Sequence, residues 1–125
     1  MGISNPKETT VKKFAVILFA AMSLSSFAAD TAVKGYLVDL ACGTENATKP
    51  GFGAKHTKSC LQMPDCAKSG YGVLTADQKI IKFDPAGNKK ASEFIAASNK
   101  ENDFKVSVTG AVNGDKMSVS NIEAQ

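Results

Sequence analysis

One segment of this chain holds every cysteine and the only histidine. Cys42, His56, Cys60 and Cys66 fall within residues 42–69, a 28-residue stretch with little apolar periodicity. Ordering a residue costs about 1–2 kcal/mol of backbone entropy, and so few apolar side chains cannot offset that cost by burial. Long connections of this kind are often functional, and a metal can supply the missing stabilisation. We therefore expect a cross-link within this segment.

The spacing of the four residues is compatible with a metal site. His56 and Cys60 stand four positions apart, so one helical turn would place both side chains on the same face. Cys60 and Cys66 bracket Pro64, which favours a turn. Three thiolates and an imidazole make a complete tetrahedral ligand set for zinc, and they are soft enough for copper(I). This interpretation assigns Cys42, His56, Cys60 and Cys66 as ligands of zinc or copper.

Neighbouring residues are candidates for supporting roles. Asp39 lies three positions before Cys42, where it could hold His56 or a metal-bound water; the alternative is an ordinary carboxylate at a strand end. Met63 could supply a thioether to copper or fill a gap in the packing. Three aromatic residues lie close to these cysteines in the sequence and could form the wall of a pocket, although core packing is their default role: Tyr36, Phe52 and Tyr71.

A disulfide is the competing interpretation. An odd number of cysteines allows one intramolecular disulfide at most and leaves one thiol over. The bond would join Cys60 to Cys66, or Cys42 to one of them, and His56 would then be a surface residue. A catalytic thiol is a third possibility. The sequence alone leaves the metal site, the disulfide and the catalytic thiol open.

Residues 1–28 read as a secretory signal peptide. Three lysines precede an unbroken apolar run at 14–21, and the small residues of Ser26-Phe27-Ala28 suit cleavage after Ala28. The apolar run is far shorter than the roughly 20 residues that span a bilayer, so we expect no membrane-spanning segment. Export to the periplasm or secretion is expected, and residues 29–125 are expected to form a single domain.

The remaining chain predicts a small, mainly β domain. Residues 33–40, 71–76, 79–84, 104–109 and 117–122 have the alternation or β-branched character of strands, with tight turns at 77–78 and 113–115. Asn88 could cap one short helix over 89–98, with Phe94 and Ile95 on its apolar face. This order predicts a five-stranded OB-like barrel with a long Cys-rich loop, residues 42–69, between its first two strands. An open α+β sheet is the alternative.

Several motifs together resemble those of one group of proteins. Asp39-Leu40-Ala41-Cys42, His56-x3-Cys60 and Cys66-x3-Gly70 are similar to the D-x-x-C…H…C…C-x-x-x-G arrangement of small exported bacterial proteins. The resemblance covers most of residues 29–125. It implies a bacterial envelope setting and a shared Cys/His site, but no established function.

The charge and residue content exclude some functions and leave others. Without the three lysines and one glutamate of residues 1–28, 12 lysines face 11 acidic residues, and the chain has no arginine, so nucleic-acid binding is not expected. We expect a small exported binding protein with a structural or metal-handling Cys/His site. The rival is a disulfide-stapled module without metal that binds an envelope protein or polymer. An enzyme that uses a metal-bound water, with Asp39 as base, is weaker because general acid/base groups are few.

Overall fold

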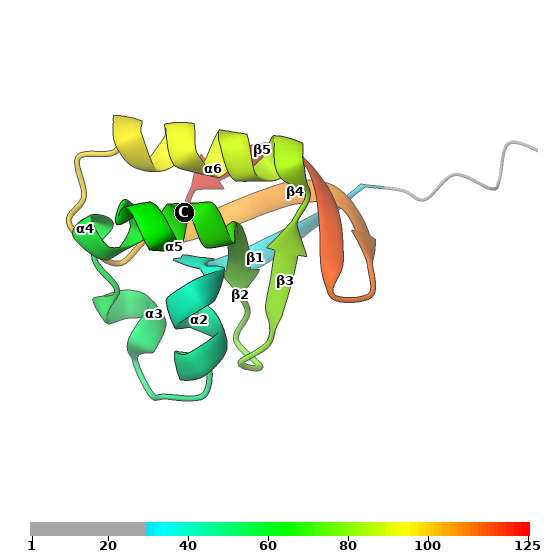
Figure 1. The fold of residues 1–125 in the computed structure, drawn as a ribbon. Helices are drawn as coiled ribbons and strands as arrows, with labels where there is room; N and C mark the ends of the chain where they lie inside the picture. Colours follow the sequence, from blue (N-terminus) through cyan, green and yellow to red (C-terminus); the bar gives the residue numbers. More distant parts are fainter. Residues whose placement is uncertain (1–29) are drawn as a thin grey trace, which may run out of the picture.

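A computed structural model describes residues 30–125 of the chain. The signal peptide expected at residues 1–28 lies outside the described residues. Within them, five strands and five helices follow one another in a mainly β domain. The helices are short except for the last one, α6. Figure 1 shows the four shorter helices gathered on one side of the strands and α6 lying above them.

The five strands form a single sheet that closes on itself. They are β1 (Thr31–Asp39), β2 (Tyr71–Leu74), β3 (Ile80–Phe83), β4 (Lys105–Asn113) and β5 (Lys116–Ala124). Their order is β1-β2-β3-β5-β4, and the sheet closes because β1 pairs with β4 through its first half and with β2 through its second half. Every pairing is antiparallel except that of β3 with β5. The prediction of five strands in a mainly β domain is confirmed.

The core lies inside this sheet and under α6. Val106 and Val108 on β4 alternate with more exposed neighbours and are fully buried, as the alternating sequence predicted. The β4–β5 hairpin turns at Asn113-Gly114-Asp115, where Gly114 takes a positive φ of 67° that favours glycine. The other large core side chains come from β1, β2, β3 and β5, from α4 and α6, and from the residue before β4: Leu37, Leu61, Val73, Phe83, Ile95, Phe104, Met117 and Val119.

The segment between β1 and β2 differs from the loop expected there. It forms four short helices, α2 (Leu40–Asn46), α3 (Phe52–Lys55), α4 (Lys58–Leu61) and α5 (Pro64–Ser69). The expectation of one helix in the whole domain was therefore wrong. Side-chain caps explain why short helices form here: Asp39 accepts a hydrogen bond from the N–H of Cys42, and Thr57 accepts one from the N–H of Cys60. Pro64 occupies the first position of α5, where its fixed φ favours helix initiation.

The last helix starts earlier than expected. It spans Pro85–Ala97, and its N-cap is Asp84 rather than Asn88. The Asp84 carboxylate accepts hydrogen bonds from the N–H of Gly87 at 2.9 Å and from the N–H of Val119 on β5 at 3.1 Å. Asn88 instead accepts a hydrogen bond from the N–H of Tyr71 at 2.8 Å, which ties α6 to the start of β2.

Candidate functional site

Asp39 is the centre of the candidate site. It is the last residue of β1, and no part of it is exposed to solvent. One carboxylate oxygen, Oδ2, accepts the N–H of Cys42 at 2.9 Å and so caps α2. The other oxygen, Oδ1, lies 2.6 Å from Nε2 of His56. A buried carboxylate with both oxygens occupied is held in one fixed orientation.

The charge state of this pair follows from its contacts. Burial raises the pKa of the Asp39 carboxyl, but the hydrogen bonds from His56 and from the N–H of Cys42, together with the charge of His56, outweigh burial and lower it below the ordinary value of 3.8. Asp39 is therefore ionised near neutral pH and acts only as an acceptor. It follows that Nε2 of His56 carries the proton in this hydrogen bond.

His56 is held by α3 as well as by Asp39. It ends this helix, and its backbone N–H donates to the carbonyl of Phe52 at 2.9 Å. The centroids of the His56 and Phe52 rings lie 4.7 Å apart at an interplanar angle of 40°. The His56 side chain is only 5% exposed, so α3 and β1 bury the imidazole–carboxylate pair between them.

Two cysteines complete the cluster. Cys42 lies in the first turns of α2, Cys66 lies in α5, and their Sγ atoms and a carboxylate oxygen of Asp39 are all within 4.8 Å of one another. Helices α2 and α5 lie side by side because the N–H of Leu40 donates to the carbonyl of Gly70 at 2.9 Å, and that of Ala41 to Oγ of Ser69 at 3.0 Å. We call Asp39, Cys42 and Cys66 the cap cluster.

The thiols of the cap cluster are weak acids in this environment. Burial and then the negative charge of Asp39 raise the pKa of Cys42, and the same two causes raise the pKa of Cys66 to about 12. Both cysteines are therefore thiols at neutral pH while the site holds no cation. A bound divalent metal would reverse this balance, because it stabilises thiolates and carboxylates together.

The remaining residues expected at the site lie outside the cap cluster. Cys60 is half-buried in α4, and its Sγ is not among the ligand atoms that the structure brings within 4.8 Å of one another in residues 30–125. The side chain of Met63, between α4 and α5, is 51% exposed. His56 reaches the cap cluster only through Asp39. Tyr71 is buried in the core, where its hydroxyl donates to the carbonyl of Leu61 at 2.8 Å.

The central position of Asp39 had a signal in the sequence. An Asp at a strand end three residues before Cys42 is a helix N-cap pattern, but the segment was expected to be a loop, so the cap was not recognised. Because the cap fixes the carboxylate beside the backbone of Cys42, it also fixes the distance between Asp39 and the first thiol.

Comparison with known proteins adds no family assignment. No protein-family model, curated protein or solved structure matches the chain. No helix within residues 30–125 is long and apolar enough to cross a membrane.

Proposed function

We propose that this is an exported protein, periplasmic or secreted, that binds a thiophilic transition metal in the cap cluster. The observation that carries the proposal is the convergence of two thiols and one ionised carboxylate within 4.8 Å of one another. Thiolate and carboxylate oxygen are both common zinc ligands, whereas copper(I) prefers sulfur alone. The mixed donor set of the cap cluster therefore favours zinc, with copper as the second choice.

In this proposal His56 is a positioning residue. It donates from Nε2 to Asp39, and a partner of this kind orients a ligating carboxylate. Cys60 is not part of the ligand set, so the proposal differs from the four-ligand set that the sequence suggests. With three protein donors, one coordination position would stay open to water or to a partner's ligand.

We also propose that the domain is an OB-like barrel of the small exported bacterial type. Five strands in the order β1-β2-β3-β5-β4, with α6 between β3 and β4, support this assignment. In this arrangement the cap cluster sits where β1 runs into the segment that joins it to β2, a connection that OB-folds use for ligands.

The test is zinc affinity, measured by competition with a chromogenic chelator on metal-free, reduced protein. Cys42→Ser and Cys66→Ser should each weaken zinc binding by more than about tenfold, and His56→Ala by about 10–100-fold through Asp39. Cys60→Ser is the matched control and should leave the affinity unchanged. Unchanged affinity in Cys42→Ser and Cys66→Ser would refute the proposal, and a loss in Cys60→Ser equal to theirs would restore the four-ligand set.

A disulfide between Cys42 and Cys66 is the second candidate, in a barrel that binds an envelope protein or polymer without metal. Their thiols are the cysteine pair that the described residues bring together, and an oxidising compartment favours such a bond. All three cysteines are free thiols in the structure. Thiol titration of the unfolded protein from its native compartment separates the candidates: one reactive thiol, Cys60, supports the disulfide, and three support the metal site.

A further inference from the structure

We propose that a second, separate site on this domain binds a small organic anion. The site is a cavity of about 430 Å³ between β1, the turn and helix α3 of the long segment, the end of β2 and the start of β4. A volume of this size is typical of small-ligand pockets. Six of the sixteen lining residues are glycine or alanine, which explains why the surface is hollow here.

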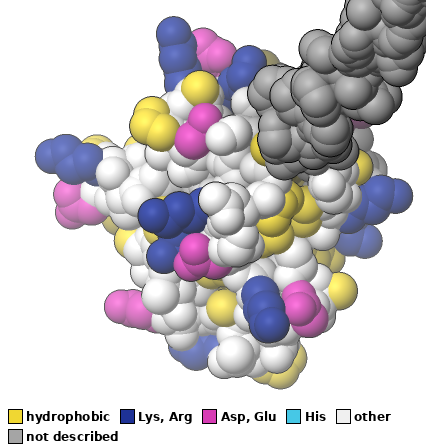
Figure 2. All heavy atoms as spheres, turned by 90° about the vertical axis from the view of Figure 1, so that its right-hand side faces the viewer, with side chains coloured by type: hydrophobic (Ala, Val, Ile, Leu, Met, Phe, Trp, Pro, Cys, Tyr) yellow, Lys and Arg dark blue, Asp and Glu magenta, His cyan; other side chains and the backbone are white. Residues whose placement is uncertain are grey.

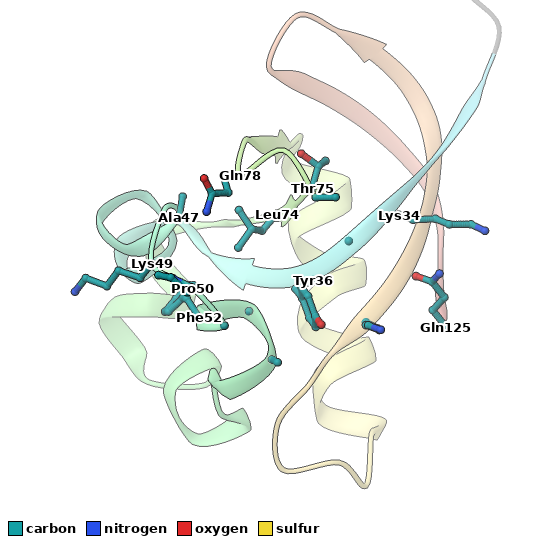
Figure 3. Close-up of a pocket in the computed structure, with 16 residues that line it drawn as sticks. Lys34, Tyr36, Ala47, Lys49, Pro50, Phe52, Leu74, Thr75, Gln78 and Gln125 are labelled. Carbon is teal, nitrogen blue, oxygen red and sulfur yellow. The ribbon is translucent and has the colours of Figure 1, made fainter.

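The walls of the cavity are aromatic and aliphatic. Its large apolar lining residues are Tyr36 on β1, Phe52 at the start of α3 and Leu74 at the end of β2, with Pro50 before α3. Figure 3 shows these side chains grouped in the middle of the site. Of the three aromatic residues considered as pocket walls from the sequence, Tyr36 and Phe52 line this cavity and Tyr71 does not. Such walls suit a flat or aliphatic ligand body.

The charges around the cavity have one sign. Lys34, Lys49 and Lys105 line it, and no aspartate or glutamate does. Lys34 and Lys49 lie at opposite ends of the site in Figure 3. The Lys105 ammonium lies over the Tyr36 ring, 5.9 Å from its centroid, so one positive charge sits directly at the aromatic wall.

The lysines of the cavity are free to meet a ligand. None of the three forms a salt bridge with an acidic residue in the part of the chain that the structure describes. Two other hollows mix charges: one combines Lys82 and Lys116 with Asp84, and the other combines Lys79 with Asp77 and Asp115. The face in Figure 2 likewise shows lysines interspersed with acidic side chains. An excess of unpaired positive charge beside apolar walls selects for an anionic head group on an apolar body.

A pair of fluorescent probes tests this inference. Anilinonaphthalene sulfonate combines an aromatic body with an anionic group, and phenylnaphthylamine has the same body without the sulfonate. At low ionic strength the anionic probe should bind at one site and at least about tenfold more tightly than the neutral probe, because only the sulfonate can accept hydrogen bonds from the lysine ammonium groups. Equal affinity for the two probes would overturn the proposal of an anion site.

Variants of single residues locate the probe. Lys105→Gln should weaken binding of the anionic probe about three- to tenfold. The control Lys89→Gln, on the exposed face of α6, should leave it unchanged. Ala47→Phe, which fills part of the cavity, should weaken both probes while the protein keeps its melting temperature. An equal loss in Lys105→Gln and Lys89→Gln would overturn the proposal, because it would reflect net charge alone.

Competition then identifies the head group. Displacement of the anionic probe by benzoate but not by phenyl phosphate would assign a carboxylate ligand, and the reverse a phosphate ligand. Benzylamine, which has a similar body and a positive charge, should not compete. Displacement by benzylamine as effective as that by benzoate would overturn the proposal. These measurements read out probe binding and not metal content, so they test the cavity separately from the proposed metal site.

Discussion

At the scale of single residues, Asp39 is the side chain on which the contacts of the candidate site converge. It ends β1, caps α2 through the N–H of Cys42, holds His56 at 2.6 Å and shares the cap cluster with two thiols. Each of these contacts depends on a carboxylate that is fully buried and ionised. A neutral amide at this position would keep the shape but could accept only one of these two hydrogen bonds.

Asp39→Asn is expected to lower the free energy of unfolding by about 1–3 kcal/mol, because Asp39 is fully buried and the substitution leaves a buried donor without its acceptor. An amide can accept through one atom only, so either His56 or the N–H of Cys42 loses its acceptor. Urea denaturation of the metal-free protein measures the change. The control Glu93→Gln, on the exposed surface of α6, should alter stability by no more than about 0.5 kcal/mol. Equal stability of Asp39→Asn and the native protein would contradict the buried pair.

The candidate site was only partly readable from these residues. The clustering of Cys42, His56 and Cys66 in one segment pointed to the part of the chain where the structure brings Asp39, Cys42 and Cys66 together. The sequence does not show whether Cys60 or Cys66 lies next to Asp39 and Cys42. That depends on where α4 ends and α5 begins, at Met63-Pro64. A spacing of six positions is compatible with either outcome until the helix ends are known.

At the scale of elements, helix caps decide where the chain turns. The strands were predictable because alternation and turn residues mark them, as in β4 and the turn at Gly114. The start of α6 was predicted four residues too late, at residue 89 with Asn88 as the cap, whereas the helix begins at Pro85. Proline at the first position of a helix, after an aspartate cap, is a start signal, and the structure has Asp84 and Pro85 in those places.

Asp84→Ala tests the most connected of these caps. The carboxylate accepts from the N–H of Gly87 in α6 and from the N–H of Val119 in β5, so its loss removes a cap and also an acceptor between two elements. We expect the free energy of unfolding to fall by about 1–3 kcal/mol. Thermal denaturation followed by circular dichroism measures this change, with Asp65→Ala, an exposed acidic residue in the first turn of the short helix α5, as the control. A smaller loss of stability in Asp84→Ala than in Asp65→Ala would show that the hydrogen bond from Val119 to Asp84 contributes nothing.

At the scale of the whole molecule, stability should fall toward both ends of the pH range. The folded pKa of Asp39 lies below 3.8, so its contribution is present above that pH and is lost as the pH falls through the folded value. The folded pKa of Cys66 is raised from 9.0 to about 12, so folding favours the thiol; this contribution is complete below pH 9.0 and is lost as the pH rises toward 12.

Urea denaturation at a series of pH values measures both sides of the curve of stability against pH, the acid limb and the alkaline limb. For one such group the free energy of unfolding changes by up to about 1.4 kcal/mol per pH unit within its window. Cys66→Ser should flatten the alkaline limb and leave the acid limb, whereas Asp39→Asn should flatten the acid limb. Tyr71→Phe separates the contribution of the phenol, whose pKa is also raised by burial and by the neighbouring charges. An alkaline limb of the same slope in Cys66→Ser would contradict the protonated thiol.

The Phe52–His56 contact has a consequence for the molecule as a whole. One side chain serves as a wall of the anion cavity and also lies 4.7 Å, centroid to centroid, from the imidazole that orients Asp39. Any movement of Phe52 on filling the cavity would change the free energy of the imidazole–carboxylate pair. Thermodynamic linkage then requires reciprocity: an anion that tightens zinc binding by some factor must itself bind more tightly to the zinc-loaded protein by the same factor. Binding of an anion in the cavity would thus change the affinity of this small domain for zinc, and binding of zinc would change its affinity for the anion.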